Sequence, residues 1–474
     1  MQQQIPNMLV TISKRLFLSL TGIFILVNVQ AQQKVLGIKE AEQLALANYG
    51  TIKAKANQLN ASKASLTETK TEALPDLNVS AQQVYGTING TDGPLSAYGG
   101  ITVASSGPAL PSQNWNTAFG SLYVSNINWN FFAFGRAREK IKVQRNVVTL
   151  DESDLAQEQF EHEIRVASTY LTLLVDQQLS KAEQDNLNRS LDLQKVVIAR
   201  VKNGLNPGVD SSLANAQVSN AKIALTNAQQ VVADQANQLA IYLGIAPQDF
   251  VLDSTFVKKT PNNIFADPAT GTEEHPLLKY YRNRIGVSDE QAKYLSTFAY
   301  PTFSLFGTYQ GRGSGFKSDI GTDASDYNSS YGAGADPTRY NYLLGIGVSW
   351  DLTNIFRTRY QVRSQKFTSD QYTNEYDLVD QQLHDQEALA TIKINNALKN
   401  NAEAPVEVKA SSDAYNQKFA LYKNGLANIV DFTDALYTLN RAEVDRDITE
   451  NNVWQALLYK AAATGDFGVF INNF

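Results

Sequence analysis

Cysteine is absent from the sequence. That absence excludes disulfides, thiolate metal sites, a cysteine nucleophile and a lipid anchor attached to an N-terminal cysteine. Histidine is scarce, and His162, His275 and His384 lie far apart in the sequence, so each is expected on the surface rather than in a metal site. No Ser-His-Asp order and no phosphate-binding loop is recognisable. We therefore expect no enzyme activity, no cofactor and no bound metal.

An excess of positive charge is also missing. The chain has 41 Lys and Arg residues against 47 Asp and Glu residues, and its formal net charge is −6. It contains no basic tract that would follow a phosphate backbone. Nucleic acid is therefore not an expected partner.

Long apolar runs are confined to the N-terminus. The run from Leu16 to Val29 follows Lys14 and Arg15 and leads to a small-x-small cleavage site ending at Ala31. Because this run is short for a membrane span, residues 1–31 are predicted to be a signal peptide, with an uncleaved anchor helix as the alternative. Either Met1 or Met8 can serve as the translation start. An exported chain without a helical anchor is periplasmic, secreted, or inserted in an outer membrane as strands.

The same order of motifs occurs twice, about 221 residues apart. The matching residues are Asn203-Gly204-Leu205 with Asn424-Gly425-Leu426, Val209-Asp210 with Val430-Asp431, Trp129 with Trp350, and Arg136 with Arg357. A repeat of this length indicates duplicated supersecondary structure. We predict a first repeat over residues 32–245, a linker over 246–275, a second repeat over 276–464 and a C-terminal tail over 465–474.

Four segments alternate between apolar and small or polar residues, as β-strands do. They are predicted at about 76–88, 117–131, 302–310 and 340–352. The last is the clearest, and aromatic residues near both ends of its apolar face resemble the two girdles of a membrane-spanning strand. A half-buried sheet in a soluble protein would alternate in the same way, but the signal peptide favours the membrane. The aromatic residues predicted at the membrane interfaces are Phe119, Trp129, Tyr340, Tyr342 and Trp350.

Each predicted strand pair is joined by a long segment rich in glycine and serine, over residues 89–116 and 311–339. Both segments are longer than a hairpin needs. Because the long loops of outer-membrane barrels face the exterior, we place them there.

A very long helical segment follows each strand pair. Residues 136–203 contain no proline or glycine, and the counterpart over 357–424 is interrupted only by Pro405. With their return helices they form predicted hairpins over 136–243 and 357–464. At about 1.5 Å per residue each long helix spans roughly 100 Å. Helices of this length need partners along them, as in a coiled coil.

The predicted sheet is too small to close by itself. A sheet cannot leave open edges in hydrocarbon, and single-chain barrels begin at about eight strands, whereas this chain offers four. Two copies would make a barrel filled by side chains, and three copies would leave a lumen. The small and polar inward faces suit a water-filled lumen, so we expect a ring of three copies.

The chain resembles the TolC-like outer-membrane efflux proteins over about residues 35–465. The resemblance lies in the duplicated order of helix, strand pair and long hairpin and in the two hairpin turns. The resemblance implies an α+β membrane protein with four β-strands per chain in a trimeric twelve-stranded β-barrel, continuous with a twelve-helix periplasmic α-barrel. It implies the exit duct of a tripartite efflux or type I secretion system, a passive conduit for small molecules or proteins. The implied partners are a homotrimer, a periplasmic adaptor (membrane fusion protein), an inner-membrane pump and outer-membrane lipid.

The resemblance also implies roles for the hairpin turns. Residues matching the adaptor-docking tips are Arg200, Asn203, Gly204, Leu205, Asp210, Tyr422, Asn424, Gly425 and Leu426. Gly204 and Gly425 also suit the position after a helix end, where a positive φ is wanted. Asp431 and Asp434 match aspartates that form a charged ring at the periplasmic aperture, and capping of the return helix is the alternative role. Ala427 stands where some members carry an arginine that latches the tip.

Three other functions remain open at this point. A structural or adhesive periplasmic coiled-coil protein would also have long helices. A periplasmic adaptor has hairpins too, but usually one, together with lipoyl-like β modules that this chain lacks. An enzyme would need a convergent polar site that the sequence does not show. The identity of the cargo cannot be read here, because such a duct takes its specificity from its pump.

Overall fold

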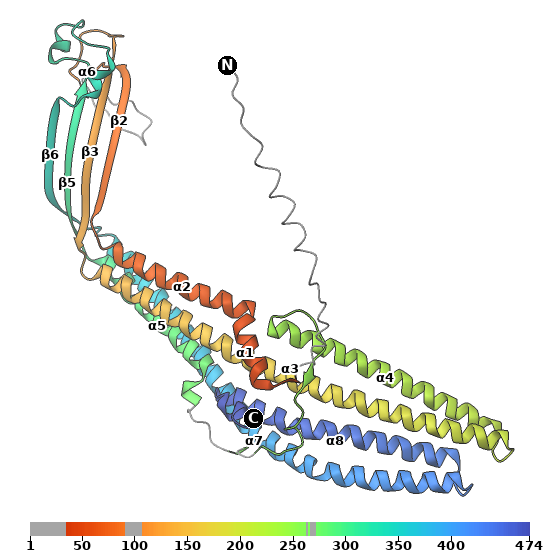
Figure 1. The fold of residues 1–474 in the computed structure, drawn as a ribbon. Coiled ribbons are helices and arrows are strands. Elements are labelled where there is room, and N and C mark those ends of the chain that lie inside the picture. Colours follow the sequence, from red (N-terminus) through yellow and green to blue (C-terminus); the bar gives the residue numbers. More distant parts are fainter. Residues whose placement is uncertain (1–34, 91–106, 262–263, 266–271) are drawn as a thin grey trace, which may run out of the picture.

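A computed structural model describes residues 35–90, 107–261, 264–265 and 272–474. The predicted signal peptide over 1–31 lies outside the described residues, as do parts of the segments 89–116 and 246–275. The chain is elongated, with a β-sheet at one end and two helical hairpins reaching to the other (Figure 1). Its sheet strands are β2 (Asp76–Thr87), β3 (Thr117–Phe132), β5 (Thr302–Ser314) and β6 (Arg339–Ser349).

Each strand pair continues into a long hairpin, as the repeat predicts. The hairpins are α3 (Arg136–Lys202) with α4 (Gly208–Leu243), and α7 (Asn354–Lys423) with α8 (Ile429–Thr464). Helices α1 (Ile38–Asn48) and α2 (Gly50–Thr71) precede the first strand pair, and α5 (Pro276–Ser296) precedes the second. The smaller elements are β1 (Val35–Leu36), β4 (Val251–Leu252), α6 (Tyr331–Ala335), α9 (Gly468–Ile471) and the 3-10 turns Thr272–Glu274, Thr297–Ala299 and Ser318–Gly321.

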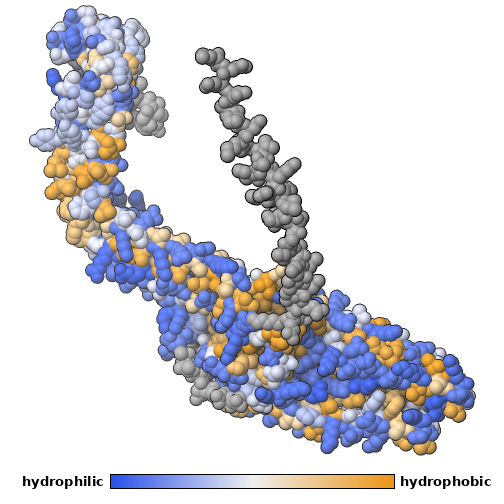
Figure 2. All heavy atoms as spheres, viewed as in Figure 1, coloured by the Kyte–Doolittle hydropathy of each residue, from blue (hydrophilic) through white to orange (hydrophobic). Residues whose placement is uncertain are grey.

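The four long strands form one antiparallel sheet in the order β2-β3-β5-β6. Strand register and alternation place their side chains on two faces. We call one the apolar face; it includes Leu77, Val79, Ile127, Leu305, Leu344, Ile346 and Val348. We call the other the polar face; it includes Asn78, Ser80, Asn126, Asn128, Thr308, Gln310 and Asn341. Figure 2 shows an apolar patch on the half of the sheet nearest the helices.

The helices form a single layer that continues from the sheet. Next to the sheet, neighbouring helices contact one another in the order α2-α3-α5-α7, and in the hairpin region in the order α4-α3-α8-α7. Hence each layer begins with an element of the first repeat and ends with an element of the second. The hairpins meet through α3 and α8, at the centre of the layer.

Two tryptophans fasten the sheet to the helices. The indole Nε1 of Trp129, near the end of β3, donates to the carbonyl oxygen of Ala73 at 2.9 Å. The indole Nε1 of Trp350, just after β6, donates to the carbonyl oxygen of Ala299 at 3.1 Å. Both carbonyls lie two residues before the proline that starts the next strand. The repeat therefore carries the same fastening twice.

The main core lies where the two hairpins meet α1 and the inter-repeat linker. Tyr170, Leu174, Leu239, Trp454 and Leu457 are buried there. The short strands β1 and β4 pair in parallel across this core. The hydroxyl of Tyr170 donates to the carbonyl oxygen of Leu36 at 2.7 Å, which ties β1 to α3.

Two strand ends differ from the prediction. Strand β5 continues to Ser314 instead of ending near residue 310, because it stays paired with β3 through Gly311 and Gly313. Strand β6 ends at Ser349, and the Asp351 carboxylate accepts from the backbone of Thr353 and Asn354 to start α7. Helix α7 continues through Pro405, at the cost of one backbone hydrogen bond.

The segment between β5 and β6, predicted as a loop, contains the short helix α6. It packs against β3, and the Ser121 hydroxyl donates to the carbonyl oxygen of Ala335 at 3.0 Å. A Cβ on Gly334 would lie 2.0 Å from the carbonyl oxygen of Phe119. The segment is therefore clamped onto the apolar face of the sheet at its far end. Across the described parts of the chain, no helix has the length and hydrophobicity to cross a bilayer.

Candidate functional site

Both hairpin turns have the same backbone geometry. Gly204 and Gly425 follow the ends of α3 and α7 with φ of 69° and 78°, the left-handed region that the sequence predicts for them. The N–H of Leu205 donates to the carbonyl oxygen of Arg200, and the N–H of Leu426 donates to that of Leu421, both at 2.9 Å. These bonds close the Schellman motif that ends a helix.

A polar network joins the two turns within one chain. The Arg200 guanidinium donates through Nη1 to the carbonyl oxygen of Lys423 at 2.8 Å and through Nε to Oδ1 of Asn206 at 2.7 Å. Asn206 in turn donates to Oδ2 of Asp210 at 2.7 Å. The guanidinium also lies 5.7 Å from the ring centroid of Tyr422, within range of a cation–π interaction. Arg200 therefore contacts both hairpins.

Aromatic packing supports this network from inside. Tyr422 and Phe432 are fully buried, with ring centroids 5.9 Å apart. Tyr415 and Phe419 pack against Phe432 at 5.4 Å each. Burial raises the pKa of the Tyr422 phenol, and the nearby Asp210 carboxylate raises it further. Tyr422, expected from the resemblance at the docking surface, is thus an internal support of the turn.

The aspartates of the return helices have different surroundings. Asp210 is buried and accepts from Asn206. Asp431, at the equivalent position of the second repeat, lies 3.8 Å from Nζ of Lys418 and its side chain is 47% exposed. Its backbone N–H donates to the Asn428 side chain, which caps α8. Asp434 is exposed one turn later. The two repeats thus place a carboxylate at the same position, but only the second presents it to solvent.

The tips expose the same pair of aliphatic side chains twice. Leu205 and Leu426 are 65% and 74% exposed, and Val209 and Val430 are 60% and 62% exposed. Asn203 and Asn424 are exposed beside them. Solvent-exposed aliphatic groups in a fixed backbone frame suit contact with a partner helix.

Sequence reasoning missed a second link between the hairpins. The Arg189 guanidinium on α3 holds the Glu443 carboxylate on α8 through two bonds of 3.1 and 2.6 Å. Both side chains are largely shielded from solvent. No sequence signal pairs these residues, because they lie 254 positions apart and outside the repeated motifs.

The predicted interface aromatics divide into two groups. Tyr340, Tyr342 and Trp350 are 60%, 85% and 53% exposed, and Trp129 is 37% exposed. Phe119 instead lies beneath the β5–β6 segment, where the Tyr331 ring meets it edge-on at 5.3 Å. Its place at a membrane interface stays a prediction.

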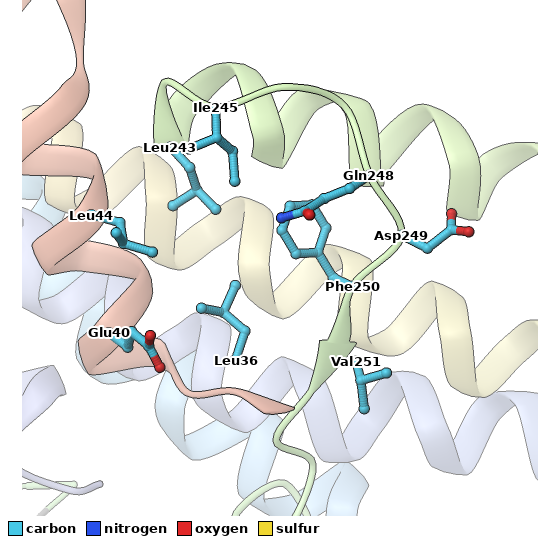
Figure 3. Close-up of a pocket in the computed structure, with 9 residues that line it drawn as sticks. All are labelled: Leu36, Glu40, Leu44, Leu243, Ile245, Gln248, Asp249, Phe250 and Val251. Atoms are coloured by element: carbon cyan, nitrogen blue, oxygen red, sulfur yellow. The ribbon is translucent and has the colours of Figure 1, made fainter. Parts of the chain in front are cut away.

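A small cavity of about 210 Å³ lies between α1 and the linker after α4. Leu243 and Ile245 point into it, and the Asp249 carboxylate points away from it (Figure 3). Its lining is mostly aliphatic, which indicates packing of the linker onto α1.

Two carboxyl groups in this central region have raised pKa values. Burial raises the pKa of Glu42 on α1 to about 8, and repulsion from Glu163 adds to the shift, while Lys39 opposes it. Burial raises the pKa of Glu163 on α3 to about 7. Oε1 of Glu42 is buried without a hydrogen-bond partner. Docking of α1 therefore favours the protonated forms.

Comparison with known proteins agrees with this geometry. The family model described as outer membrane efflux protein matches residues 42–245 and 274–463. The fold is similar to that of the outer membrane protein VceC from Vibrio cholerae, with 15% identity, a TM-score of 0.69, and 90% of this chain and 96% of VceC covered. It is similar to the Campylobacter jejuni CmeC outer membrane channel, with 13% identity, a TM-score of 0.70, and coverage of 90% and 85%. It is also similar to the Neisseria gonorrhoeae MtrE outer membrane channel, with 14% identity, a TM-score of 0.69, and coverage of 90% and 89%. Among curated proteins, none matches this chain in sequence.

Proposed function

This chain belongs to the outer membrane efflux protein family, and we propose that three copies of it close into a twelve-stranded barrel continuous with a twelve-helix periplasmic tunnel. As a member of the family it is an outer-membrane exit duct of a tripartite efflux system, located in the outer membrane of a Gram-negative bacterium and extending into the periplasm. Proteins of this family typically form trimers and work with a periplasmic adaptor and an inner-membrane pump.

The observation that carries the proposal is that every layer of the chain has two open edges. In the sheet they are β2 and β6, in the upper helices α2 and α7, and in the hairpin region α4 and α7. One edge always belongs to the first repeat and the other to the second. A head-to-tail contact between such edges generates a closed ring when the rotation from one copy to the next closes on itself. Closure removes the unpaired strand edges that hydrocarbon does not tolerate.

The outermost helices carry apolar side chains on their free sides. On α7, Leu378, Ile392 and Val406 follow one another at intervals of two heptads and are 56%, 56% and 62% exposed. On α4, Ile223 and Ile241 are 59% and 53% exposed. These are the stripes expected of helices that pack against a further helix. We assign the α7 stripe to α4 of the next copy.

The two faces of the sheet support its orientation in the barrel. The apolar face carries exposed Leu344, Ile346 and Val348 between the exposed aromatics Tyr342 and Trp350, which suits lipid. The polar face then lines the lumen. Because no reacting group is needed for passage, we propose a passive conduit without cofactor or metal.

The hairpin tips are the proposed periplasmic end. Their exposed aliphatic pairs form the contact for the adaptor. Of the predicted docking set Arg200, Asn203, Gly204, Leu205, Asp210, Tyr422, Asn424, Gly425 and Leu426, the buried Asp210 and Tyr422 act by supporting the turns from inside. Asp431 and Asp434 form the proposed aperture ring, six carboxylates in three copies. The division into residues 1–31, 32–245, 246–275, 276–464 and 465–474 is retained as part of this proposal.

The experiment that tests the proposal is the native mass and particle shape of protein extracted with detergent from the outer-membrane fraction. We expect a trimer shaped as a long hollow cylinder whose band migrates differently before and after heating. A monomer released from the periplasm without detergent would contradict the shared barrel. A particle of two copies would contradict the twelve-stranded closure and keep the ring.

A further inference from the structure

One aromatic side chain lies on the polar face of the sheet. Phe306 sits directly opposite Asn128 of β3 on one side and Gly345 of β6 on the other. Its ring is 38% exposed. Outside the bulge between Trp129 and Phe132, no other aromatic residue is placed on the polar face by the four described strands. An exposed ring among asparagine, serine and threonine side chains calls for an explanation.

Two glycines of β6 make room for this ring. A Cβ at position 345 would lie 2.6 Å from Cζ of Phe306, closer than atoms can approach, and one at position 347 would lie 3.5 Å from Cε1. The ring therefore lies down over Gly345 and Gly347 instead of standing out from the sheet. The far end of the ring lies closest to Gly345, and the Phe306 side chain stays partly exposed to solvent. A flat, fixed aromatic surface is thus part of the polar face.

We propose that the exposed part of the Phe306 ring is a contact site for flat aromatic cargo inside the barrel, three copies per channel. This inference rests on the proposed function, since it needs the polar face to line the lumen. Offset stacking needs an accessible aromatic ring, and the Phe306 side chain is partly exposed. Its cross-strand partners Asn128 and Gly345 are polar or small and leave the ring accessible, and Leu343 is an aliphatic neighbour without an aromatic surface. The site favours brief contact during passage and does not hold cargo tightly.

The Phe306 ring also stabilises the sheet, because an aromatic ring that covers glycines in a strand shields their backbone from water. Two substitutions separate the roles. Phe306→Leu keeps an apolar cover over the glycines and removes the aromatic face. Phe306→Tyr keeps both. Leu343→Ala is the matched control, since Leu343 is a 61% exposed apolar residue on the same face with no ring to offer.

The experiment is single-channel recording of the purified trimer in a planar bilayer, with the probe added on the side of the long loops. Proflavine is the flat aromatic cation, and tetrabutylammonium is the aliphatic cation of the same charge. We expect proflavine to block the current transiently, with a dwell time about five-fold shorter in Phe306→Leu and unchanged in Phe306→Tyr and Leu343→Ala; five-fold corresponds to about 1 kcal/mol. Tetrabutylammonium should not distinguish the variants.

The outcomes distinguish failure of the Phe306 contact from failure of the proposed channel. A conducting trimer whose proflavine dwell time is the same in Phe306→Leu as in the unmodified protein overturns this inference alone. A five-fold loss for both probes overturns it as well, because the contact would then not be aromatic. An unmodified protein that forms no trimer and no pore overturns the proposed function and this inference with it.

Discussion

Arg200 and Lys423 are joined by a bond between a side chain and a backbone carbonyl oxygen, 2.8 Å long, across 223 positions of the sequence. The donor ends α3 and the acceptor ends α7, so the bond spans the two hairpins at their tips. Because the acceptor is a backbone atom, a change of the Lys423 side chain leaves the bond in place.

Arg200→Ala is expected to loosen the tips against one another. The lost contacts are exposed or partly buried, and each is worth about 1 kcal/mol. The chain has no cysteine, so spin labels at Asn203→Cys and Asn424→Cys report on this region alone. We expect a broader distance distribution in pulsed electron paramagnetic resonance. Lys195→Ala is the control, because Lys195 pairs only within α3, with Asp192. Identical distributions in both variants would refute the link.

Asp434→Asn is expected to reduce the cation preference of the pore more than Asp431→Asn does. Lys418 lies 3.8 Å from the Asp431 carboxylate and offsets part of its charge, whereas Asp434 is exposed. Six carboxylates at an aperture attract cations. Reversal potentials in a salt gradient measure the preference. Unchanged selectivity in the double variant would remove the aperture ring from the proposal.

Stability should fall as pH rises through the neutral range. The folded protein holds the pKa of Glu42 at about 8, above its ordinary value of 4.5, so it binds more protons than the unfolded chain between these pH values. Its stabilising contribution is therefore complete below about pH 4.5 and is lost as the pH passes 8. A shift of this size corresponds to on the order of 5 kcal/mol.

Glu42→Gln tests this pH dependence. We expect the variant to melt at a higher temperature than the unmodified protein at pH 8.5 and at a similar temperature at pH 5, because glutamine has no charge to bury. Glu40→Gln is the control, since Glu40 lies on the same helix. A variant that is less stable at both pH values would show that the Glu42 carboxylate is stabilising in its charged form.

Gly334→Ala should release the β5–β6 segment from the sheet. Its Cβ would lie 2.0 Å from the carbonyl oxygen of Phe119, whereas a Cβ at Gly332, two residues earlier in the same helix, would meet nothing within 4 Å. We expect limited proteolysis to cut the segment at least about ten-fold faster in Gly334→Ala, which corresponds to about 1.4 kcal/mol of local opening. Gly332→Ala should be cut at the unmodified rate. Equal rates would mean that the segment is not clamped.

The repeat made most of the fold predictable from sequence. Its tip motif Asn-Gly-Leu ends a long helix in both repeats. The positive φ of Gly204 and Gly425 follows from the local sequence, because glycine tolerates this conformation. The end of β5 was not predictable, because Gly311 and Gly313 weaken any strand pattern. Glycine is needed at both positions, because a side chain at Gly311 would meet Tyr340 and one at Gly313 would meet α6.

The site was less predictable than the fold. Arg200 is recognisable as a tip residue, but its acceptor on the other hairpin depends on how two distant segments meet. From its place at a turn, Tyr422 is expected at the surface, yet the cluster around Phe432 buries it. Phe119 has the alternation of a lipid-facing residue, and only the folded β5–β6 segment shows that it is covered. For Arg200 and Phe119 the missing information is a contact with a segment far along the chain. For Tyr422 it is the packing of α8 against the end of α7.

The paired indole bonds of Trp129 and Trp350 have a mechanical consequence. They join sheet and helices at two separate points, and two attachment points prevent one body from swivelling on the other. Motion at the hairpin tips must then be taken up by bending along the long helices before it arrives at the strands. The sheet can therefore keep its position while the hairpin tips move.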